Sequence, residues 1–206
     1  MNNETTVIIC CAGMGTRLGI GLPKALVDID NKPLIIHLLE LFDEFEDVRV
    51  VVGYQAEKII EVVNKYRKDI MFTFNYDYKT TGPAASLTKA LVGAKDIVLS
   101  IGGDVLIDKE NLDKILKCDE CIPYTDITSE EPTLIDVQNN EVREIGKSGN
   151  YEWQGIVKIK RNKLINSNKY IYEMINQNLP MKGIYINSRE IDSQEDYDNA
   201  IKYYIK

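Results

Sequence analysis

The stretch that most constrains this chain lies near its start, where an apolar run leads into a loop with two glycines. Residues 7–11 are β-branched or small and apolar, with no polar alternation. Such a run is typical of a strand that is buried on both faces, as in a parallel sheet with helices on both sides. The first strand is therefore predicted to lie inside a covered sheet.

The loop that follows this strand carries the first functional signal. Gly13 and Gly15 permit positive φ angles and close approach of a ligand. Successive N–H groups in such a turn form a concavity that binds anions. Arg17 and Lys24 add two positive charges. Glycines alone would indicate only a strand-to-helix turn, and the added Thr16, Arg17 and Lys24 favour a polyphosphate site.

Apolar runs of strand length alternate with helical runs through the first half of the chain. This alternation predicts a doubly wound, mostly parallel α/β sheet. The second half changes to a hairpin at 133–145, a strand at 155–160, a helix at 164–176 and a capped final helix after Ser193. The whole chain, 1–206, is predicted to be one domain with a β-rich lobe around 133–160.

Charge and composition exclude several classes of function. The formal net charge is −7, which argues against a nucleic-acid or membrane-surface binder, because such proteins carry a basic face. No run approaches the length of a transmembrane helix, and the N-terminus lacks a signal-peptide pattern, so a cytoplasmic location is expected. Cys118 and Cys121 have metal-ligand spacing, but the chain has a single histidine and no second pair of this kind, so a zinc site is not expected.

Two carboxylates are predicted to hold Mg²⁺. In an open parallel sheet, ligands bind beyond the carboxyl ends of the strands, and Asp104 follows such a strand after two glycines. Mg²⁺ prefers one or two carboxylates together with substrate phosphates. Asp192 is the best second ligand, because it ends a short strand while Ser193 is left to cap the helix.

These residues resemble the signature of the sugar-phosphate and alcohol-phosphate nucleotidyltransferases, with the small bacterial phosphocholine cytidylyltransferases as the nearest group. The resemblance rests on the segments 13–18, 23–27, 32–35 and 190–197. It implies Mg²⁺-dependent transfer of a nucleotidyl group from a nucleoside triphosphate to a small phosphorylated alcohol or amino alcohol, with release of pyrophosphate. It also implies a role in making precursors of cell-surface polysaccharides or lipids.

The resemblance also implies roles for individual residues. Arg17, Lys24 and Asp104 would be catalytic, and Asp104 and Asp192 would bind the metal. The nucleotide would contact Ala12, Gly13, Met14, Gly15, Thr16, Gly53, Thr81, Gly82 and Ser86. Trp153 beside Glu152 is the usual combination for an ammonium group, so these two residues and Tyr185 are candidates for binding the acceptor. Packing of Trp153 inside the lobe is an equal alternative.

Alternatives remain open for the identity of the nucleotide and for the function of the protein. The resemblance implies CTP, because the short segment from Arg17 to Lys24 is similar to that of methylerythritol-phosphate cytidylyltransferases, and UTP and dTTP are alternatives. A sugar-1-phosphate nucleotidyltransferase is the nearest alternative enzyme. A non-catalytic nucleotide sensor is the alternative of another class, although such a domain would lose Lys24 or the metal carboxylates. A Rossmann dehydrogenase is disfavoured, because the third glycine of its loop is missing.

Overall fold

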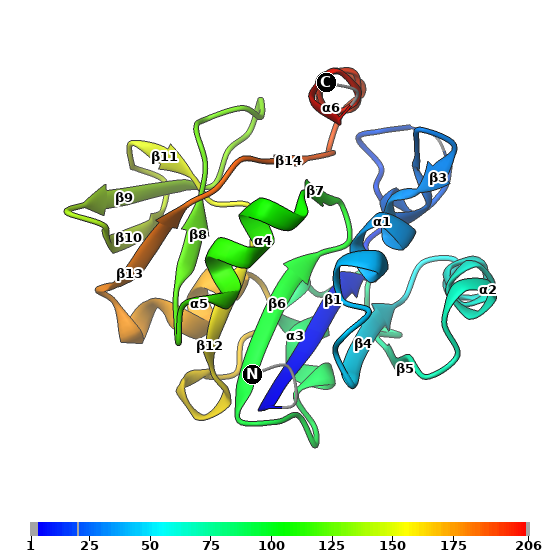
Figure 1. Cartoon of the computed structure of the whole chain (residues 1–206), viewed down its shortest axis with the longest axis horizontal. Coiled ribbons are helices and arrows are strands. Elements are labelled where there is room, and N and C mark those ends of the chain that lie inside the picture. The colour runs from blue at the N-terminus through cyan, green and yellow to red at the C-terminus, as the bar shows by residue number, and fades with distance from the viewer. Residues whose placement is uncertain (1–3, 20, 205–206) are drawn as a thin grey trace.

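The computed structural model describes residues 4–19 and 21–204, and its centre is a five-stranded sheet in the order β12-β6-β1-β4-β5 (Figure 1). β1 (Thr5–Cys11) pairs in parallel with β4 (Asp47–Val52) and with β6 (Ile97–Gly102). β4 pairs in parallel with β5 (Met71–Phe74), and β12 (Val157–Lys160) is antiparallel to β6. The predicted fold class, a mostly parallel α/β sheet, is confirmed.

Helices lie on both faces of this sheet, which explains the uninterrupted apolar run of β1. Val7 and Ile9 pack into one core cluster, and Ile8 packs into the cluster on the opposite face. The first cluster takes in α1 (Leu34–Leu41), α2 (Ala56–Tyr66) and α4 (Lys109–Leu116), and the second takes in α3 (Pro83–Ala90) and α5 (Ile171–Ile175).

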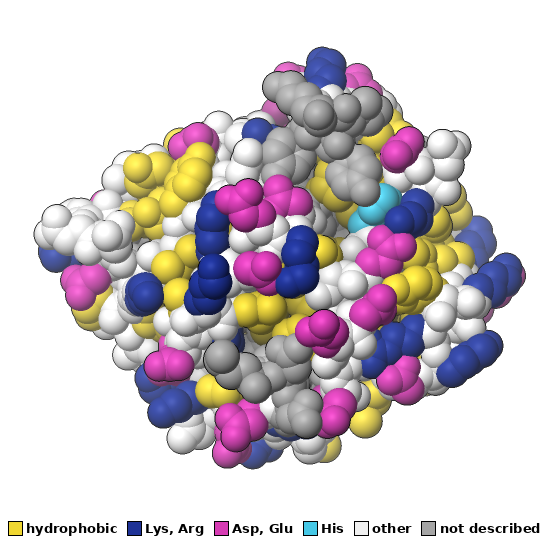
Figure 2. All heavy atoms as spheres, viewed as in Figure 1, with side chains coloured by type: hydrophobic (Ala, Val, Ile, Leu, Met, Phe, Trp, Pro, Cys, Tyr) yellow, Lys and Arg dark blue, Asp and Glu magenta, His cyan; other side chains and the backbone are white. Residues whose placement is uncertain are grey.

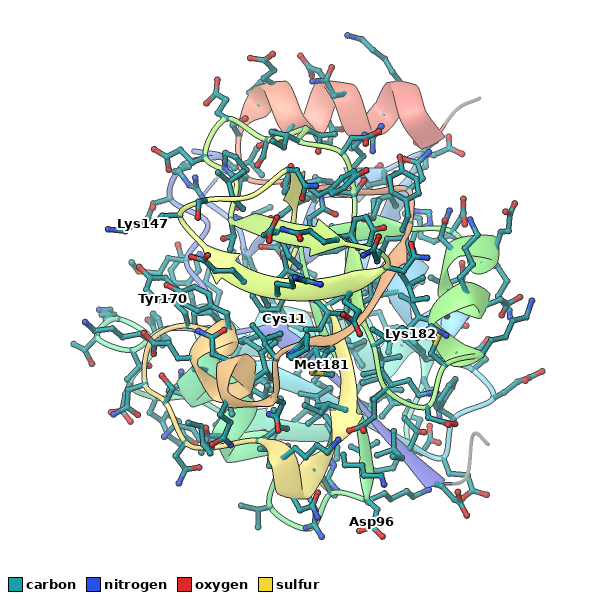
Figure 3. All side chains as sticks on the ribbon, turned by 90° about the vertical axis from the view of Figure 1, so that its left-hand side faces the viewer. Cys11, Asp96, Lys147, Tyr170, Met181 and Lys182 are labelled. Atoms are coloured by element: carbon teal, nitrogen blue, oxygen red, sulfur yellow. The ribbon has the colours of Figure 1, made fainter. Side chains whose placement is uncertain are left out.

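A second five-stranded sheet forms the lobe, in the order β11-β9-β10-β13-β8, and Figure 3 looks onto it with Met181 and Lys182 of β13 labelled. Its strands are β8 (Ile122–Tyr124), β9 (Leu134–Gln138), β10 (Glu141–Gly146), β11 (Tyr151–Glu152) and β13 (Met181–Tyr185). The lobe therefore draws on segments outside 133–160, while β12, expected within it, joins the central sheet.

Short elements complete the chain and carry much of the site. These are β2 (Asp28–Ile29), β3 (Lys32–Pro33), β7 (Val105–Ile107), β14 (Ser188–Glu190), α6 (Gln194–Tyr204) and 3-10 turns at Lys24–Leu26, Arg161–Lys163 and Asn176–Asn178. β14 pairs antiparallel with β7, which follows directly on the end of β6. This pairing brings the C-terminal segment to the carboxyl edge of the central sheet.

The prediction of one helix over 164–176 is wrong, because only Ile171–Ile175 is α-helical. The preceding residues are held in an extended path by the start of α3. Gly82 N donates to Asn168 O at 2.7 Å, and Ala84 N donates to Lys169 O at 3.2 Å. Tertiary hydrogen bonds thus replace the local bonds that a longer helix would need.

The face seen in Figure 2 carries acidic and basic side chains interspersed, without a continuous basic area. Within residues 4–19 and 21–204, no helix combines the length and the apolar character that a membrane span requires.

Candidate active site

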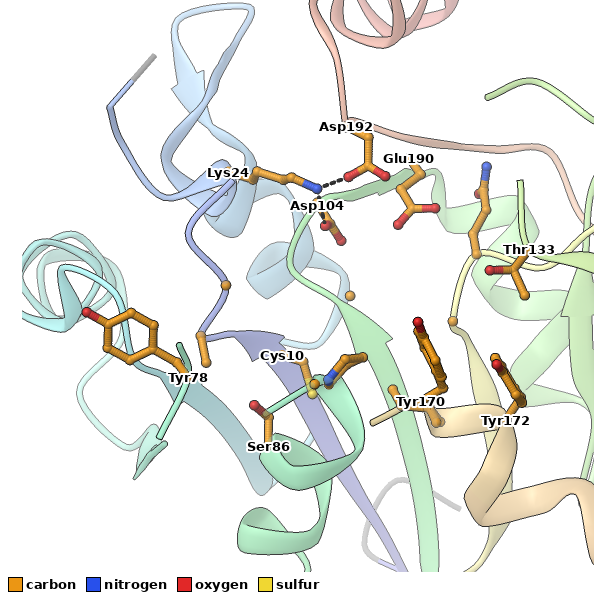
Figure 4. A pocket seen from close by; sticks show the side chains of 18 of the residues that line it. Cys10, Lys24, Tyr78, Ser86, Asp104, Thr133, Tyr170, Tyr172, Glu190 and Asp192 are labelled. Atoms are coloured by element: carbon orange, nitrogen blue, oxygen red, sulfur yellow. Dashed lines mark hydrogen bonds and ion pairs between the residues drawn. The ribbon is translucent and has the colours of Figure 1, made fainter. Parts of the chain in front are cut away.

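A cavity of about 380 Å³ opens at the carboxyl edge of the central sheet, between that sheet and the lobe (Figure 4). Charged side chains gather at one end of it, where Figure 4 shows Lys24, Asp104, Glu190 and Asp192 together. Tyr170 and Tyr172 lie on the other side of the cavity from Tyr78. The cavity thus has a charged end, a side formed by the 75–86 region, and an aromatic side next to the lobe.

The charged end joins residues that are far apart in the sequence. The ammonium of Lys24 lies 3.1 Å from Asp104 Oδ2 and also forms an ion pair with Asp192 Oδ1. Arg17 Nη2 donates to Asp192 Oδ2. The predicted catalytic and metal-binding residues, Arg17, Lys24, Asp104 and Asp192, therefore occupy one cluster.

Glu190 belongs to the same cluster, although it was not among the residues predicted from the sequence. Asp104, Glu190 and Asp192 each offer one carboxylate oxygen, and these atoms lie within 4.8 Å of one another. Burial, together with the negative charge of Asp104, raises the pKa of Glu190 to about 8. One signal could have revealed it, because residues two apart on an extended segment point to the same side, and Glu190 stands two before Asp192.

Three carboxylates around one point fit a hard divalent cation. Mg²⁺ takes oxygen ligands and is usually held by one or two carboxylates and substrate phosphates. Asp104, Asp192 and Glu190 are therefore the residues that could hold Mg²⁺.

Local backbone features position the side chains of Lys24, Asp104 and Asp192. Gly15 has a φ of +60°, and a Cβ there would lie 2.8 Å from Lys24 Cγ, so glycine lets the lysine chain pass. Gly103 N donates to Cys10 O at 2.9 Å, which fixes the turn that presents Asp104. Ser193 Oγ accepts from Asp196 N at 3.2 Å, and Asp196 accepts from Ser193 N at 2.9 Å. The carboxylate of Asp192 takes no part in this reciprocal cap, so it can serve the cavity.

The side formed by the 75–86 region is organised by Asn75, which is buried. Its amide nitrogen donates to Thr81 Oγ1 at 3.1 Å and to Ser86 Oγ at 3.0 Å. Thr81, Gly82 and Ser86, which are predicted to contact the nucleotide, line the cavity. The N–H of Gly82 is already donated to Asn168 O, so it is not a ready donor for a nucleotide base.

The aromatic side corrects the acceptor prediction. Trp153 lines the cavity, and its indole N–H donates to Ile156 O at 2.8 Å. Tyr172 meets Trp153 edge-on at 6.4 Å, and Tyr170 stacks on Tyr172 at 5.0 Å. Both tyrosines line the cavity, yet neither was predicted from the sequence, because they stand in a segment that was expected to be an ordinary helix.

Glu152 and Tyr185, the other two acceptor candidates, do not line the cavity. Glu152 is fully buried, and its carboxylate accepts hydrogen bonds from the backbone of Thr128 and Ser129. Tyr185 is exposed on the lobe and donates to Asp126 at 2.8 Å. The hydrogen bonds of Glu152 direct its carboxylate to residues 128–129, so the expected pair of Trp153 and Glu152 does not form in the cavity.

The remaining predicted nucleotide residues divide into two groups. Ala12 and Gly13 line the cavity, and Gly15 lines a small adjoining hollow with Lys24 and Asp104. Met14, Thr16 and Gly53 do not line the main cavity. At Gly53 a Cβ would come within 2.8 Å of Ala12 O, so this glycine serves close packing behind the loop.

Comparison with known proteins gives a family match over most of the chain. The family described as MobA-like NTP transferase domain matches residues 7–142. The bifunctional protein GlmU of Methanococcus maripaludis strain C5 is 33% identical over 128 residues. That alignment covers 60% of this chain and 30% of GlmU, so the chain spans less than a third of the length of this relative.

Solved structures match over nearly the whole chain at low identity. CTP:phosphocholine cytidylyltransferase from Streptococcus pneumoniae (LicC) has a TM-score of 0.79 and 22% identity, with 98% of this chain and 99% of that chain covered. HddC from Yersinia pseudotuberculosis, complexed with GMP-PN, has a TM-score of 0.75 and 20% identity, with 97% and 99% covered. These likenesses show a shared fold.

Proposed function

Because this chain belongs to the MobA-like NTP transferase family, we propose that it transfers a nucleotidyl group from a nucleoside triphosphate to a small phosphorylated alcohol or amino alcohol. The observation that carries this proposal is the convergence of Arg17, Lys24 and three carboxylates at one end of a single cavity. The two positively charged side chains, Arg17 and Lys24, lie beside a site for a divalent metal, and together they suit the triphosphate of the nucleotide and the phosphate of the acceptor.

The reaction needs no covalent intermediate with the protein. A phosphate oxygen of the acceptor attacks the α-phosphorus, the bond from that phosphorus to the bridging oxygen breaks, and pyrophosphate leaves with the electron pair. The acceptor phosphate is already an anion, so a general base is not required. The barrier lies in bringing anions together and in stabilising charge on the leaving group.

The residues at the charged end of the cavity have different roles in this reaction. Arg17 suits phosphate oxygens in a fork geometry, and Lys24 supplies a compact charge that can bridge the acceptor phosphate and the α-phosphate. Asp104, Glu190 and Asp192 would hold Mg²⁺, which neutralises phosphate charge when bound. Lys24 already lies among these carboxylates, so it stays close to the reacting phosphates.

CTP is the proposed nucleotide, supported by the short path from Arg17 to Lys24 and by the likeness to LicC. HddC, which has a similar fold, is complexed with GMP-PN, so the base has to be tested directly. The acceptor is proposed to place its non-phosphate end against Trp153, Tyr170 and Tyr172. Aromatic faces of this kind suit an alkylated ammonium or an apolar group.

Pyrophosphate release should be measured with CTP, UTP, dTTP, ATP and GTP, each against phosphorylated amino alcohols, plain alcohols and sugar 1-phosphates, in the presence of MgCl₂. We expect turnover to be highest with CTP and an alcohol or amino alcohol phosphate. Preference for a sugar 1-phosphate would establish the alternative enzyme. Nucleotide binding without pyrophosphate release from any pair would indicate a nucleotide sensor instead.

A further inference from the structure

A loop of the lobe, residues 126–132, reaches across to Arg17 beside the cavity. Backbone hydrogen bonds close this loop at its base. Thr125 and Glu152 exchange N–H···O bonds of 3.0 and 2.9 Å, and Trp153 N donates to Thr133 O at 2.8 Å. The loop is thus fastened on both sides to the β11 segment.

The carboxylate of Glu152 fixes the loop from beneath. Its oxygens accept from Thr128 N at 2.7 Å, from Ser129 N at 3.1 Å and from Ser129 Oγ at 2.9 Å. The side chain is 0% exposed. A buried carboxylate is stable only with such partners, and the bonds are strong because the acceptor is charged. They fix the turn that immediately precedes Glu131.

Glu131 then meets the cation that the proposed reaction assigns to the triphosphate. Arg17 Nη1 donates to Glu131 Oε2 at 2.9 Å, and Arg17 Nη2 donates to Asp192. Carboxylate oxygens therefore take the guanidinium donors that phosphate oxygens would use. A separate cavity of about 270 Å³, lined by Arg17, Glu130, Glu131 and Asp192 among others, leaves room for Glu131 to turn away.

We propose that Glu131, positioned by Glu152, is a built-in competitor of the triphosphate, which holds Arg17 in the empty site and releases it when nucleotide binds. The proposal rests on the proposed function of Arg17. The apparent affinity for the triphosphate equals the intrinsic affinity multiplied by the fraction of molecules in which Arg17 is released. The side chains of Arg17 and Glu131 are 51% and 78% exposed, and such ion pairs are weak. Removing Glu131 should therefore tighten binding only about two- to five-fold.

The test is calorimetric titration with CTP and with inorganic tripolyphosphate, both with MgCl₂. Glu131→Gln is compared with Glu130→Gln, which removes the same charge from the same cavity but is not an ion partner of Arg17 among the described residues. We expect Glu131→Gln to bind both probes about two- to five-fold more tightly, and Glu130→Gln to change much less. When Arg17→Ala is also present, Glu131→Gln and Glu130→Gln should bind the two probes with equal affinity.

Equal effects of Glu131→Gln and Glu130→Gln, or weaker binding by Glu131→Gln, would overturn the proposal while leaving the proposed function intact. If the unaltered protein binds neither probe, both proposals fail. If it binds the probes but releases no pyrophosphate from any substrate pair, only the proposed function fails, and the comparison of the variants still decides the role of Glu131.

The positioning role of Glu152 is tested separately, by hydrogen exchange and by affinity. In Glu152→Gln, hydrogen exchange should accelerate in peptides covering 126–132 and stay unchanged in peptides of the central sheet. The affinity should shift in the direction of Glu131→Gln, with no further shift in the double variant. Unchanged exchange in the loop, or additive affinity shifts, would exclude this role. If Glu152→Gln does not fold, Ser129→Ala removes one of the same hydrogen bonds from a half-buried position.

Discussion

At the scale of single residues, the site depends on charges whose partners are already in place. Lys24 lies between Asp104 and Asp192, which hold its ammonium at the charged end of the cavity, where the proposed reaction needs a positive charge. Preorganised charge of this kind stabilises a transition state more than mobile charge does.

Lys24→Ala and Asp104→Ala should each keep the fold and reduce turnover by about 10²-fold or more, the scale of losing one preorganised electrostatic contact. Pyrophosphate release under saturating substrate is the measurement, with circular dichroism to verify folding. Lys65→Ala is the matched control, because Lys65 forms an exposed ion pair with Glu61 on α2. Near-normal turnover in either folded site variant would remove that residue from the proposed machinery.

At the scale of elements, Arg49 ties β4 to the end of α3. Its guanidinium is buried and donates to the carbonyl oxygens of Ala90, Val92 and Gly93 at 2.8, 2.6 and 2.8 Å. The same group pairs with Asp47 at 2.8 Å. These contacts satisfy carbonyls that the helix end leaves without partners.

Arg49→Met should lower the free energy of unfolding by about 3 kcal/mol, because it leaves Asp47 and the carbonyls at the end of α3 without their donor. Denaturant unfolding measures this directly. Arg49→Lys keeps the charge but not the planar fork, so we expect an intermediate loss. Equal stability of all three proteins would show that water replaces the guanidinium without cost.

Gly82 joins α3 to the segment that carries the aromatic residues. A Cβ at this position would lie 2.0 Å from Lys169 O, which is backbone and cannot give way cheaply. Gly82→Ala should therefore displace 168–170, lower the unfolding midpoint and raise the KM for the acceptor more than the KM for the nucleotide. Steady-state kinetics with each substrate varied in turn tests this. Equal rises in both KM values would contradict an effect confined to the aromatic side.

At the scale of the whole molecule, an acidic chain that gathers three carboxylates at one point should be stabilised by a divalent cation. Mg²⁺ should raise the melting temperature of the native protein, since a ligand that binds only the folded state adds stability by mass action. The rise should be lost in Asp192→Asn and on addition of EDTA. A rise of the same size in Asp192→Asn would place the cation elsewhere.

The sequence by itself determined the parts of this protein that depend on local pattern. The buried first strand, the glycine loop with Arg17 and Lys24, and the capped helix after Asp192 follow from residue type and spacing alone. The sheet class followed as well, since alternating buried strands and helices allow few architectures. The rule that ligands gather at the carboxyl ends of strands was enough to select Asp104, and Asp192 was selected because it ends a short strand just before a capped helix.

Only the tertiary structure decided the remainder, because strand partners and loop docking depend on contacts between distant segments. Alternation along 155–160 indicates a strand but does not identify its partner, and the partner is β6 rather than the lobe. Glu190 entered the cluster through pairing of β14 with β7. Docking of 168–170 on Gly82 cut short the expected helix and left Tyr170 and Tyr172 at the cavity. The free energy that selects these strand partners and docked segments comes from burial and long-range hydrogen bonding, and a local sequence pattern does not specify either of them.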